Sequence, residues 1–460
     1  MITENLCINN RPESRSFAST RNACKLCAPL GACLAFRGIE GAVPFLHGSQ
    51  GCSTYIRRYM ISHFKEPMDV ACSNFGETTA IFGGKENLRV GLANVIQQYQ
   101  PSLIGIATTC LAETIGDDVS MFLHEIRPEL DAMGSVRVVH VSTPSYAGSH
   151  DEGYRAAVRA LVDQLAEASP AADCVNLFPG MVSPADVRYL KRLFMDFGTD
   201  VSCIPDYSDT LDGPVWEDYH RVPEGGTSID RVRSASGARA SIELGGTCRP
   251  ELSAAALLEE RFRVPKHQIP LPIGVCLTDQ LMETLEAITG RPLPKEHAAE
   301  RGRLIDAIVD AHKYVIGKRA VVYGEPDLVV GLAGMLAEIG VLPVLCATGS
   351  DTGKLAKQVA AVAPDMADDI TVIENIDFLG IEDRCRALDV DLIVGNSKGF
   401  KLSQSIGVPL VRVGFPIHDR IGGARLLHLG YRGAQQLFDR ITNALIEAKQ
   451  NASTVGYTYM

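Results

Sequence analysis

Ten short apolar runs recur along the chain, separated by stretches with helical character. The runs cover residues 43–46, 103–107, 136–141, 174–178, 240–244, 271–275, 320–323, 344–347, 391–394 and 410–413. Continuous apolar runs of this length are typical of strands that are buried on both faces, and their alternation with helices is typical of parallel β-α-β units. The pattern therefore predicts an α/β fold of several doubly wound, Rossmann-like domains with parallel sheets.

The length of 460 residues is enough for about three domains at roughly 150 residues each. A long polar helical stretch over residues 295–316 leads into the last set of strands. We therefore predict an N-terminal arm (1–20), a first α/β domain (21–150), a second (151–294) and a third (295–460). The arm is rich in Ser, Arg and Asn, and we expect it to be loosely packed.

One apolar stretch, residues 328–349, is near the length of a membrane span and contains a single charge, Glu338. Gly340 and Pro343 interrupt it, so we predict a helix, a turn and a buried strand, and no membrane association. The formal net charge is -11, which argues against a nucleic-acid partner. The 13 cysteines, in a chain with no charged-then-apolar leader, indicate a reducing compartment, and we expect a cytoplasmic protein.

Small or polar residues follow several of the predicted strands, and three cysteines lie in or near such positions. Cys52 closes the loop after one strand, Cys110 ends another, and Cys27 precedes the sequence Ala-Pro-Leu-Gly. Ligands of open α/β sheets bind at the carboxyl ends of strands. Converging thiolates there would bind a soft metal or an iron–sulfur cluster. Gly48 and Gly51 would let the backbone approach the inorganic sulfur. The alternative is that each cysteine is a buried, inert thiol.

The other cysteines carry weaker signals. Cys24 and Cys27 form the only C-x-x-C pair, and a zinc ribbon would need a second pair, so we do not expect a structural zinc site. The remaining cysteines considered are expected to be buried and inert: Cys72, Cys174, Cys203, Cys248, Cys276, Cys346 and Cys385.

Six motifs, in order and with similar spacing, resemble the β (K-type) subunit of nitrogenase component 1. They are residues 27–32 (CAPLGA), 46–52 (LHGSQGC), 63–67 (HFKEP), 80–84 (AIFGG), 108–118 (TTCLAETIGDD) and 143–145 (TPS). Weaker similarities continue at residues 208–212, 225–227, 323–327 and 395–397. The resemblance covers nearly the whole chain and implies the three-domain architecture of nitrogenase component 1.

The resemblance implies a cofactor shared between two chains. Cys27, Cys52 and Cys110 fall where the family's K-type chains contribute three ligands to the P-cluster, a fused iron–sulfur double cubane completed by the α (D-type) partner. Ser145 falls where a serine joins the oxidised cluster, since a more positive iron accepts an alkoxide. Tyr55 falls where a tyrosine lies between the P-cluster and the catalytic cofactor and would assist electron transfer. The alternative for Ser145 is an ordinary turn hydroxyl, and the alternative for Tyr55 is a core tyrosine.

The resemblance also implies a divalent cation between two K-type chains. Asp306 and Asp310 are four residues apart on a predicted helix and share one face. In the family such a pair binds the cation together with a glutamate of the other K-type chain, which corresponds to Glu66 here. Lys65 replaces the family's arginine beside that glutamate. The alternative is a solvated acidic helix face.

ATP hydrolysis is not expected on this chain. Residues 349–355 (GSDTGKL) resemble a P-loop but are one residue short and lack the Ser or Thr after the lysine that would hold Mg²⁺. The resemblance assigns hydrolysis to a separate homodimeric iron protein and the complex substrate-reducing iron–sulfur cofactor to the D-type chain. The implied assembly is an α2β2 heterotetramer that contains two copies of this chain.

Several functions within the superfamily fit this pattern. We favour a K-type subunit of a nitrogenase-like reductase that relays electrons to the D-type chain. As the specific enzyme we favour methylthio-alkane reductase, which cleaves carbon–sulfur bonds. A true nitrogenase β subunit has a longer arm and chain. An N-type scaffold for cofactor maturation commonly keeps only the cysteine that corresponds to Cys52. A dark-operative protochlorophyllide or chlorophyllide reductase is the third alternative.

Overall fold

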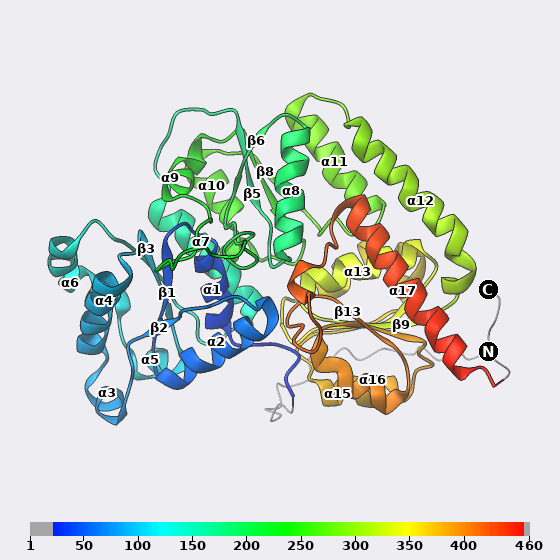
Figure 1. The fold of residues 1–460 in the computed structure, drawn as a ribbon, viewed down its shortest axis with the longest axis horizontal. Coiled ribbons are helices and arrows are strands. Elements are labelled where there is room, and N and C mark those ends of the chain that lie inside the picture. The colour runs from blue at the N-terminus through cyan, green and yellow to red at the C-terminus, as the bar shows by residue number, and fades with distance from the viewer. Residues whose placement is uncertain (1–21, 455–460) are drawn as a thin grey trace, which may run out of the picture.

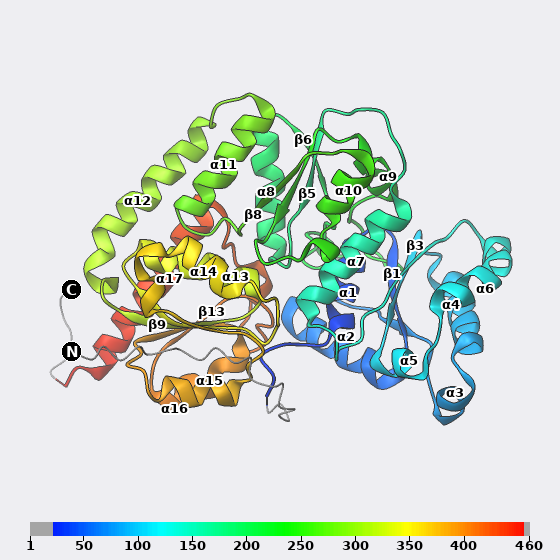
Figure 2. The ribbon, with the colours of Figure 1, turned by 180° about the vertical axis from the view of Figure 1, so that it is seen from behind.

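Three parallel β-sheets form the framework of the protein, which is described here by a computed structural model covering residues 22–454 (Figure 1). Their strand orders are β2-β1-β3-β4, β6-β5-β7-β8 and β11-β10-β9-β12-β13. Figures 1 and 2 show the three sheets as separate layers with helices packed around each of them. The predicted α/β fold with several parallel sheets is confirmed. The predicted N-terminal arm lies outside the described residues, and the exact domain boundaries stay predictions.

The first sheet contains the strands that precede two of the candidate cysteines. Its strands are β1 (Ala42–His47), β2 (Ala71–Cys72), β3 (Leu103–Thr108) and β4 (Arg137–Val141). The central strands β1 and β3 are buried along their whole length, which explains their continuous apolar sequence. The helices of this region are α1 (Ala28–Arg37), α2 (Gln50–Phe64), α3 (Glu77–Phe82), α4 (Lys85–Tyr99), α5 (Cys110–Ile115) and α6 (Val119–Met133).

The second sheet consists of β5 (Cys174–Phe178), β6 (Asp200–Cys203), β7 (Ala240–Leu244) and β8 (Lys266–Ile269). Its helices are α7 (His150–Leu165), α8 (Pro184–Asp196), α9 (Ile229–Arg233), α10 (Ala254–Phe262) and α11 (Cys276–Thr289). Helix α7 also packs along α1, so the first and second regions share an interface. The close approach of these helices requires Gly31 and Gly153, because a Cβ at either position would lie within 2.0 Å of a backbone oxygen on the other helix.

The third sheet consists of β9 (Arg319–Tyr323), β10 (Leu342–Ala347), β11 (Thr371–Ile373), β12 (Leu392–Gly395) and β13 (Leu410–Arg412). Its helices are α12 (Lys295–Val315), α13 (Pro326–Glu338), α14 (Leu355–Val362), α15 (Phe378–Cys385), α16 (Phe400–Ile406) and α17 (Gly430–Ala452). The apolar stretch 328–349 forms most of α13, a turn and β10, as predicted. Within residues 22–454 we find no helix whose length and hydropathy would let it cross a membrane.

The strand predictions were wrong at one place and incomplete at four. The run 271–275 is a buried loop, because Pro270 and Pro272 lack the amide donors that a sheet ladder needs. The strands that the apolar pattern missed are β2, β6, β8 and β11. All four lie at sheet edges. An edge strand is covered on fewer sides, so its sequence need not be a continuous apolar run.

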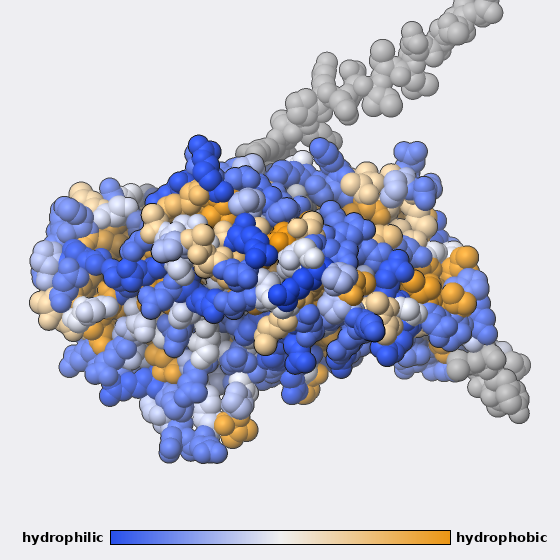
Figure 3. Space-filling view, turned by 90° about the horizontal axis from the view of Figure 1, so that it is seen from above, coloured by the Kyte–Doolittle hydropathy of each residue, from blue (hydrophilic) through white to orange (hydrophobic). Residues whose placement is uncertain are grey.

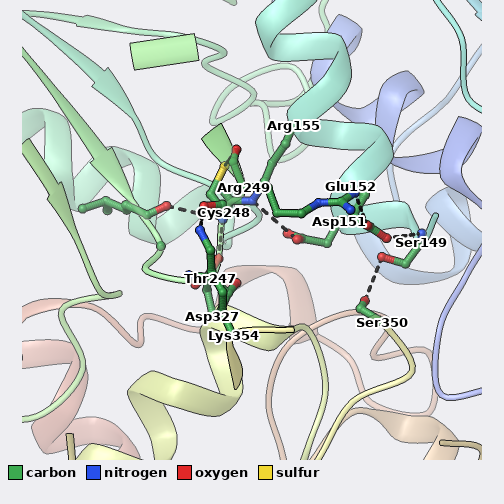
Figure 4. A network of polar contacts seen from close by, with 12 residues as sticks. Ser149, Asp151, Glu152, Arg155, Thr247, Cys248, Arg249, Asp327, Ser350 and Lys354 are labelled. Atoms are coloured by element: carbon green, nitrogen blue, oxygen red, sulfur yellow. Dashed lines mark hydrogen bonds and ion pairs between the residues drawn. The ribbon is translucent and has the colours of Figure 1, made fainter. Parts of the chain in front are cut away.

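One hydrophobic core crosses all three sheets, and a polar network lies where the three regions meet. In that network Arg155 of α7 pairs with Asp327 of α13 and with Asp151, and all three side chains are buried (Figure 4). Ser149 and Ser350 share a hydrogen bond of 2.8 Å across the same junction. On the surface, Figure 3 shows hydrophobic residues scattered in small groups among hydrophilic ones, an arrangement that is ordinary for a protein face.

Candidate metal centre

Cys27, Cys52 and Cys110 each lie at the N-terminal end of a helix. Cys27 is the N-cap of α1, Cys52 is in the first turn of α2, and Cys110 is the first residue of α5. Helices α2 and α5 follow the neighbouring parallel strands β1 and β3, in which His47 pairs with Thr108. The Cys27 thiol interacts electrostatically with the thiols of Cys52 and Cys110. The fold therefore brings together three cysteines that are up to 83 positions apart in the sequence.

The three thiols lie at helix N-terminal ends, and two of them accept hydrogen bonds. The positive end of a helix dipole attracts negative charge, and each of the three cysteines is placed at such an end. The backbone N–H of Ser145 donates a hydrogen bond to Cys110 Sγ at 3.2 Å. The hydroxyl of Ser49 donates to Cys52 Sγ at 3.7 Å. The sequence analysis did not predict the Ser49 contact. Ser49 lies three residues before Cys52 in a glycine-rich turn, and that spacing could have indicated a hydrogen bond to the thiol.

Burial raises the pKa of the Cys27 thiol to about 12, and this effect outweighs the opposing influence of the Leu30 amide. The neighbouring cysteines add to the increase, because like charges disfavour one another. In the isolated chain the Cys27 sulfur therefore keeps its proton at neutral pH. A bound cation would reverse this preference, since a coordinating thiol is deprotonated by the metal.

The three thiols are half-buried. Among residues 22–454, no group of three or more His, Cys, Asp or Glu side chains is close enough together to bind a single metal ion. The donor set nonetheless fits a multi-iron cluster. Thiolates are the usual ligands of such clusters, and N–H groups directed at sulfur tune them.

The two glycines of the loop before Cys52 have different roles. A Cβ at Gly51 would meet only the Ser49 hydroxyl, at 3.9 Å, so this backbone remains approachable. A Cβ at Gly48 would lie 2.1 Å from Thr109 Oγ1, so Gly48 allows the loops after β1 and β3 to pack together. The contact with Thr109 is a separate reason for glycine at position 48, and the approach of the Gly48 and Gly51 backbone to inorganic sulfur stays a prediction.

Ser145 and Tyr55 flank the cysteines. Ser145 is next to Cys110 through its backbone N–H, and its side chain is half-buried. Tyr55 lies on α2, is 39 % exposed and packs on Tyr59 with ring centroids 4.6 Å apart. Burial raises the pKa of the Tyr55 hydroxyl, with further contributions from Tyr59 and Cys27. Tyr55 is thus a neutral hydrogen-bond donor and acceptor beside the thiols, and it is not a core tyrosine.

The residues considered for an inter-chain cation are not brought together within one chain. Asp306 and Asp310 are exposed, one turn apart on α12. Glu66 follows α2 and is half-buried. Burial and the neighbouring carboxylate of Asp212 raise the pKa of Glu66, while the Gly213 amide lowers it. A site that combines the three residues would require a second copy of the chain.

The lysine of the P-loop-like segment is occupied by a structural contact. Lys354 Nζ donates to the backbone oxygen of Cys248 at 2.7 Å and so links the third sheet region to the second (Figure 4). The hydroxyl of Thr352 donates to Glu374 at 2.5 Å. This segment acts as a connector between regions.

The remaining cysteines are mostly buried, with two exceptions. Cys276 is exposed at the start of α11, and Cys72 is half-buried, so the prediction of burial was wrong for both. Cys276 is nevertheless a weak nucleophile, because desolvation and the carboxylate of Glu338 raise its pKa to about 11. Cys24 is buried, and its backbone packs against the loop at Gly349.

Residues 27–446 match the family model described as "Nitrogenase component 1 type Oxidoreductase". The chain belongs to this family. It is 37 % identical over 432 residues to the nitrogenase molybdenum-iron protein beta chain of Methanothermobacter marburgensis, covering 91 % of this chain and 93 % of the relative. It is equally 37 % identical over 431 residues to the nitrogenase vanadium-iron protein beta chain of Trichormus variabilis, covering 91 % and 92 %.

A solved structure of the nitrogenase component 1 family supports the same relationship. The structure titled "Nitrogenase Cp1 at pH 6.5" superposes with a TM-score of 0.92 at 33 % identity, covering 97 % of this chain and 98 % of that chain. The expectation of a nitrogenase component 1 β-type chain is therefore confirmed. The chain is an oxidoreductase subunit. The carbon–sulfur specificity is not supported by these relatives, which are named as nitrogenase beta chains.

Proposed function

We propose that this chain is the β-type subunit of a nitrogenase-type reductase and that Cys27, Cys52 and Cys110 hold its half of an interfacial P-cluster-type iron–sulfur cluster. The observation that carries the proposal is the convergence of these three thiols at the N-terminal ends of three helices. When bound, the cluster would supply reversible storage and transfer of electrons.

The residues around the thiols have distinct tasks in this proposal. The helix ends stabilise the thiolate form of the three ligands, and the Ser145 N–H and Ser49 hydroxyl withdraw electron density from two of the sulfurs. The Ser145 side chain would supply a further oxygen ligand to the cluster. Tyr55 stays protonated, because burial raises its pKa, and it would act as a neutral hydrogen-bond donor or acceptor beside the thiols.

The proposed assembly contains two copies of this chain and two α-type partners. A homodimeric, ATP-hydrolysing iron protein would donate electrons, and the α-type chain would carry the complex metallocluster at which substrate is reduced. The names of the relatives support this assignment, since they are beta chains of molybdenum-iron and vanadium-iron proteins. Glu66 of one copy, with Asp306 and Asp310 of the other, would bind a divalent cation between the two β-type chains.

The experiment is purification of the chain with its native partner, followed by iron and acid-labile sulfide analysis and electron paramagnetic resonance across redox potentials. We expect more iron at the interface than one four-iron cluster supplies. Cys52→Ala should lower the iron content and remove the cluster signal, whereas the matched control Cys276→Ala should leave both unchanged. Unchanged iron content in Cys52→Ala would contradict the proposal.

Turnover assays with the iron protein and ATP distinguish the remaining functions. Ammonia formed from dinitrogen would support a true nitrogenase β subunit, which the relatives favour. Release of thiol from a methylthio-alkane would support the carbon–sulfur reductase. A cluster that transfers to another protein without any turnover would identify the chain as an N-type maturation scaffold, and reduction of a bound pigment would identify a protochlorophyllide-type reductase.

A further inference from the structure

Glu113 links the two loops that carry Cys110 and Ser145. It lies in the first turn of α5, three residues after Cys110, so the two side chains are neighbours on the helix surface. Its Oε1 atom accepts a hydrogen bond from the Thr108 hydroxyl at the end of β3, and another of 2.5 Å from the Ser142 hydroxyl directly after β4. The carboxylate therefore joins the ends of two paired parallel strands beside a candidate cluster ligand.

The Thr108 hydroxyl connects Glu113 to the backbone of the loop after β4. A hydroxyl has one proton to donate, and Thr108 donates it to Glu113. The Thr108 oxygen then accepts a hydrogen bond of 2.9 Å from the Thr143 N–H, and the Thr143 hydroxyl donates to the Thr108 carbonyl at 2.8 Å. Thr108 and Thr143 are both buried, so water competes little for these bonds. The acceptor at Glu113 thus determines how the Thr108 oxygen is presented to the loop.

The loop held in this way carries the amide that contacts a candidate ligand. Two residues after Thr143, the backbone N–H of Ser145 donates to Cys110 Sγ at 3.2 Å. Residues 108–113 and 142–145 are therefore joined by a continuous chain of hydrogen bonds. An N–H group directed at a ligand sulfur withdraws electron density and raises the reduction potential of an iron–sulfur cluster. The direction of the Ser145 N–H would thus affect a cluster bound at Cys110.

We propose that Glu113 is a positioning residue of the cluster site, and that its Oε1 atom keeps the Ser145 N–H directed at Cys110 Sγ. It does so by fixing the hydroxyls of Thr108 and Ser142, which hold the loop after β4 against the loop after β3. The inference rests on the proposed function, because the ligand role of Cys110 belongs to that proposal. Glu113 acts through the two loops, since its carboxylate bonds to their hydroxyls.

Two variants separate the hydrogen bonds of Glu113 from its charge. A negative charge near an iron–sulfur cluster changes the reduction potential by itself, so removing the carboxylate alone is not decisive. Glu113→Gln and Glu113→Met both remove the charge and keep an unbranched side chain of similar length. Glutamine retains a carbonyl oxygen that accepts hydroxyl protons, whereas the thioether of methionine is a weak acceptor. A difference between the two variants therefore reports the hydrogen bonds.

The experiment uses the complex of the chain with its native partner and measures two quantities. The first is hydrogen exchange at the Ser145 amide, which should be at least tenfold faster in Glu113→Met than in Glu113→Gln. The second is the midpoint potential of the cluster, followed by electron paramagnetic resonance. It should be lower in Glu113→Met by about 59 mV, which is a tenfold change in the equilibrium constant of a one-electron step. Thr284→Val removes a hydroxyl that bonds within α11, and this control should change neither quantity.

A milder variant decides the question if Glu113→Met does not assemble. Ser142 is exposed, and Ser142→Ala removes one of the two hydroxyls on Glu113, so exchange at the Ser145 amide should become at least threefold faster. Equal exchange and equal potentials in the two Glu113 variants, or unchanged exchange in Ser142→Ala, would overturn the proposal. A complex without an interfacial cluster would contradict the proposed function instead, and the exchange rates would still show whether Glu113 positions the Ser145 N–H.

Discussion

Replacement of Arg155 by methionine tests whether the buried ion cluster holds the three regions together. Arg155 lies between Asp151, whose oxygen is 3.4 Å from Arg155 Nε, and Asp327, and the exposed fractions of the three side chains are 5–6 % (Figure 4). Methionine fills a similar volume but leaves the two carboxylates facing each other. Removal of one partner from a buried ion pair typically costs about 3–5 kcal/mol, because the remaining charge is not compensated.

The sign of the pH dependence follows from the carboxylates. Burial already raises the pKa of Asp151, and Arg155 opposes that increase. Without Arg155 the folded-state pKa of Asp151 rises further above the unfolded value of about 3.9. The variant should therefore be most destabilised above the raised pKa of Asp151, and the defect should shrink as falling pH protonates that carboxylate.

The assay combines urea unfolding with hydrogen exchange at the Thr247 amide, which donates to Asp327 at 2.8 Å. We expect Arg155→Met to lose about 3–5 kcal/mol at pH 8, with faster exchange at Thr247. Arg127→Met is the control, because its exposed pair with Asp131 on α6 should be worth about 0.5 kcal/mol or less. Equal losses in the two variants, or a defect in Arg155→Met that does not diminish on acidification, would refute the reasoning.

Two further predictions concern a buried histidine and a packed glycine. Burial lowers the pKa of His63 to about 3, and its Nδ1 accepts a hydrogen bond of 2.8 Å from the Ile417 amide. Because the folded pKa is below the unfolded value of about 6.5, stability should fall by about 2 kcal/mol from pH 7 to pH 5, and His63→Gln should flatten that slope in urea titrations. A Cβ at Gly105 would lie 2.1 Å from the Phe36 ring, so Gly105→Ala should destabilise by about 1–3 kcal/mol in the same assay. Gly302 on α12 has open space, and Gly302→Ala should instead stabilise by about 0.4–1 kcal/mol; the opposite order of the two alanine variants would contradict the packing argument.

Burial explains which strands the sequence revealed. Strands β1, β3 and β9 lie inside their sheets, so nearly all of their side chains are apolar and the pattern found them. Strand β8, with the sequence KHQI, is half-buried at an edge and has no such pattern. Its existence depends on pairing with β7, a contact between distant residues that local composition cannot encode.

The candidate site was predictable only where its residues follow strand ends. Cys52 and Cys110 follow β1 and β3 directly, so their proximity follows from the parallel sheet. Cys27 precedes the first strand, and its position depends on the packing of α1 against α7, which no motif of the isolated segment specifies.

The position of Cys27 also depends on the third sheet region, although all three thiols belong to the first. The amide of the preceding residue, Leu26, donates to His150 Nδ1 at 3.2 Å. The proton of His150 is then on Nε2, which donates to Glu325 at 3.0 Å, next to the start of α13. Cys27 itself forms an antiparallel bridge with Ser149. We therefore expect a shift between α7 and α13 to move Cys27 relative to Cys52 and Cys110, so that the buried junction affects the geometry of the proposed cluster site as well as stability.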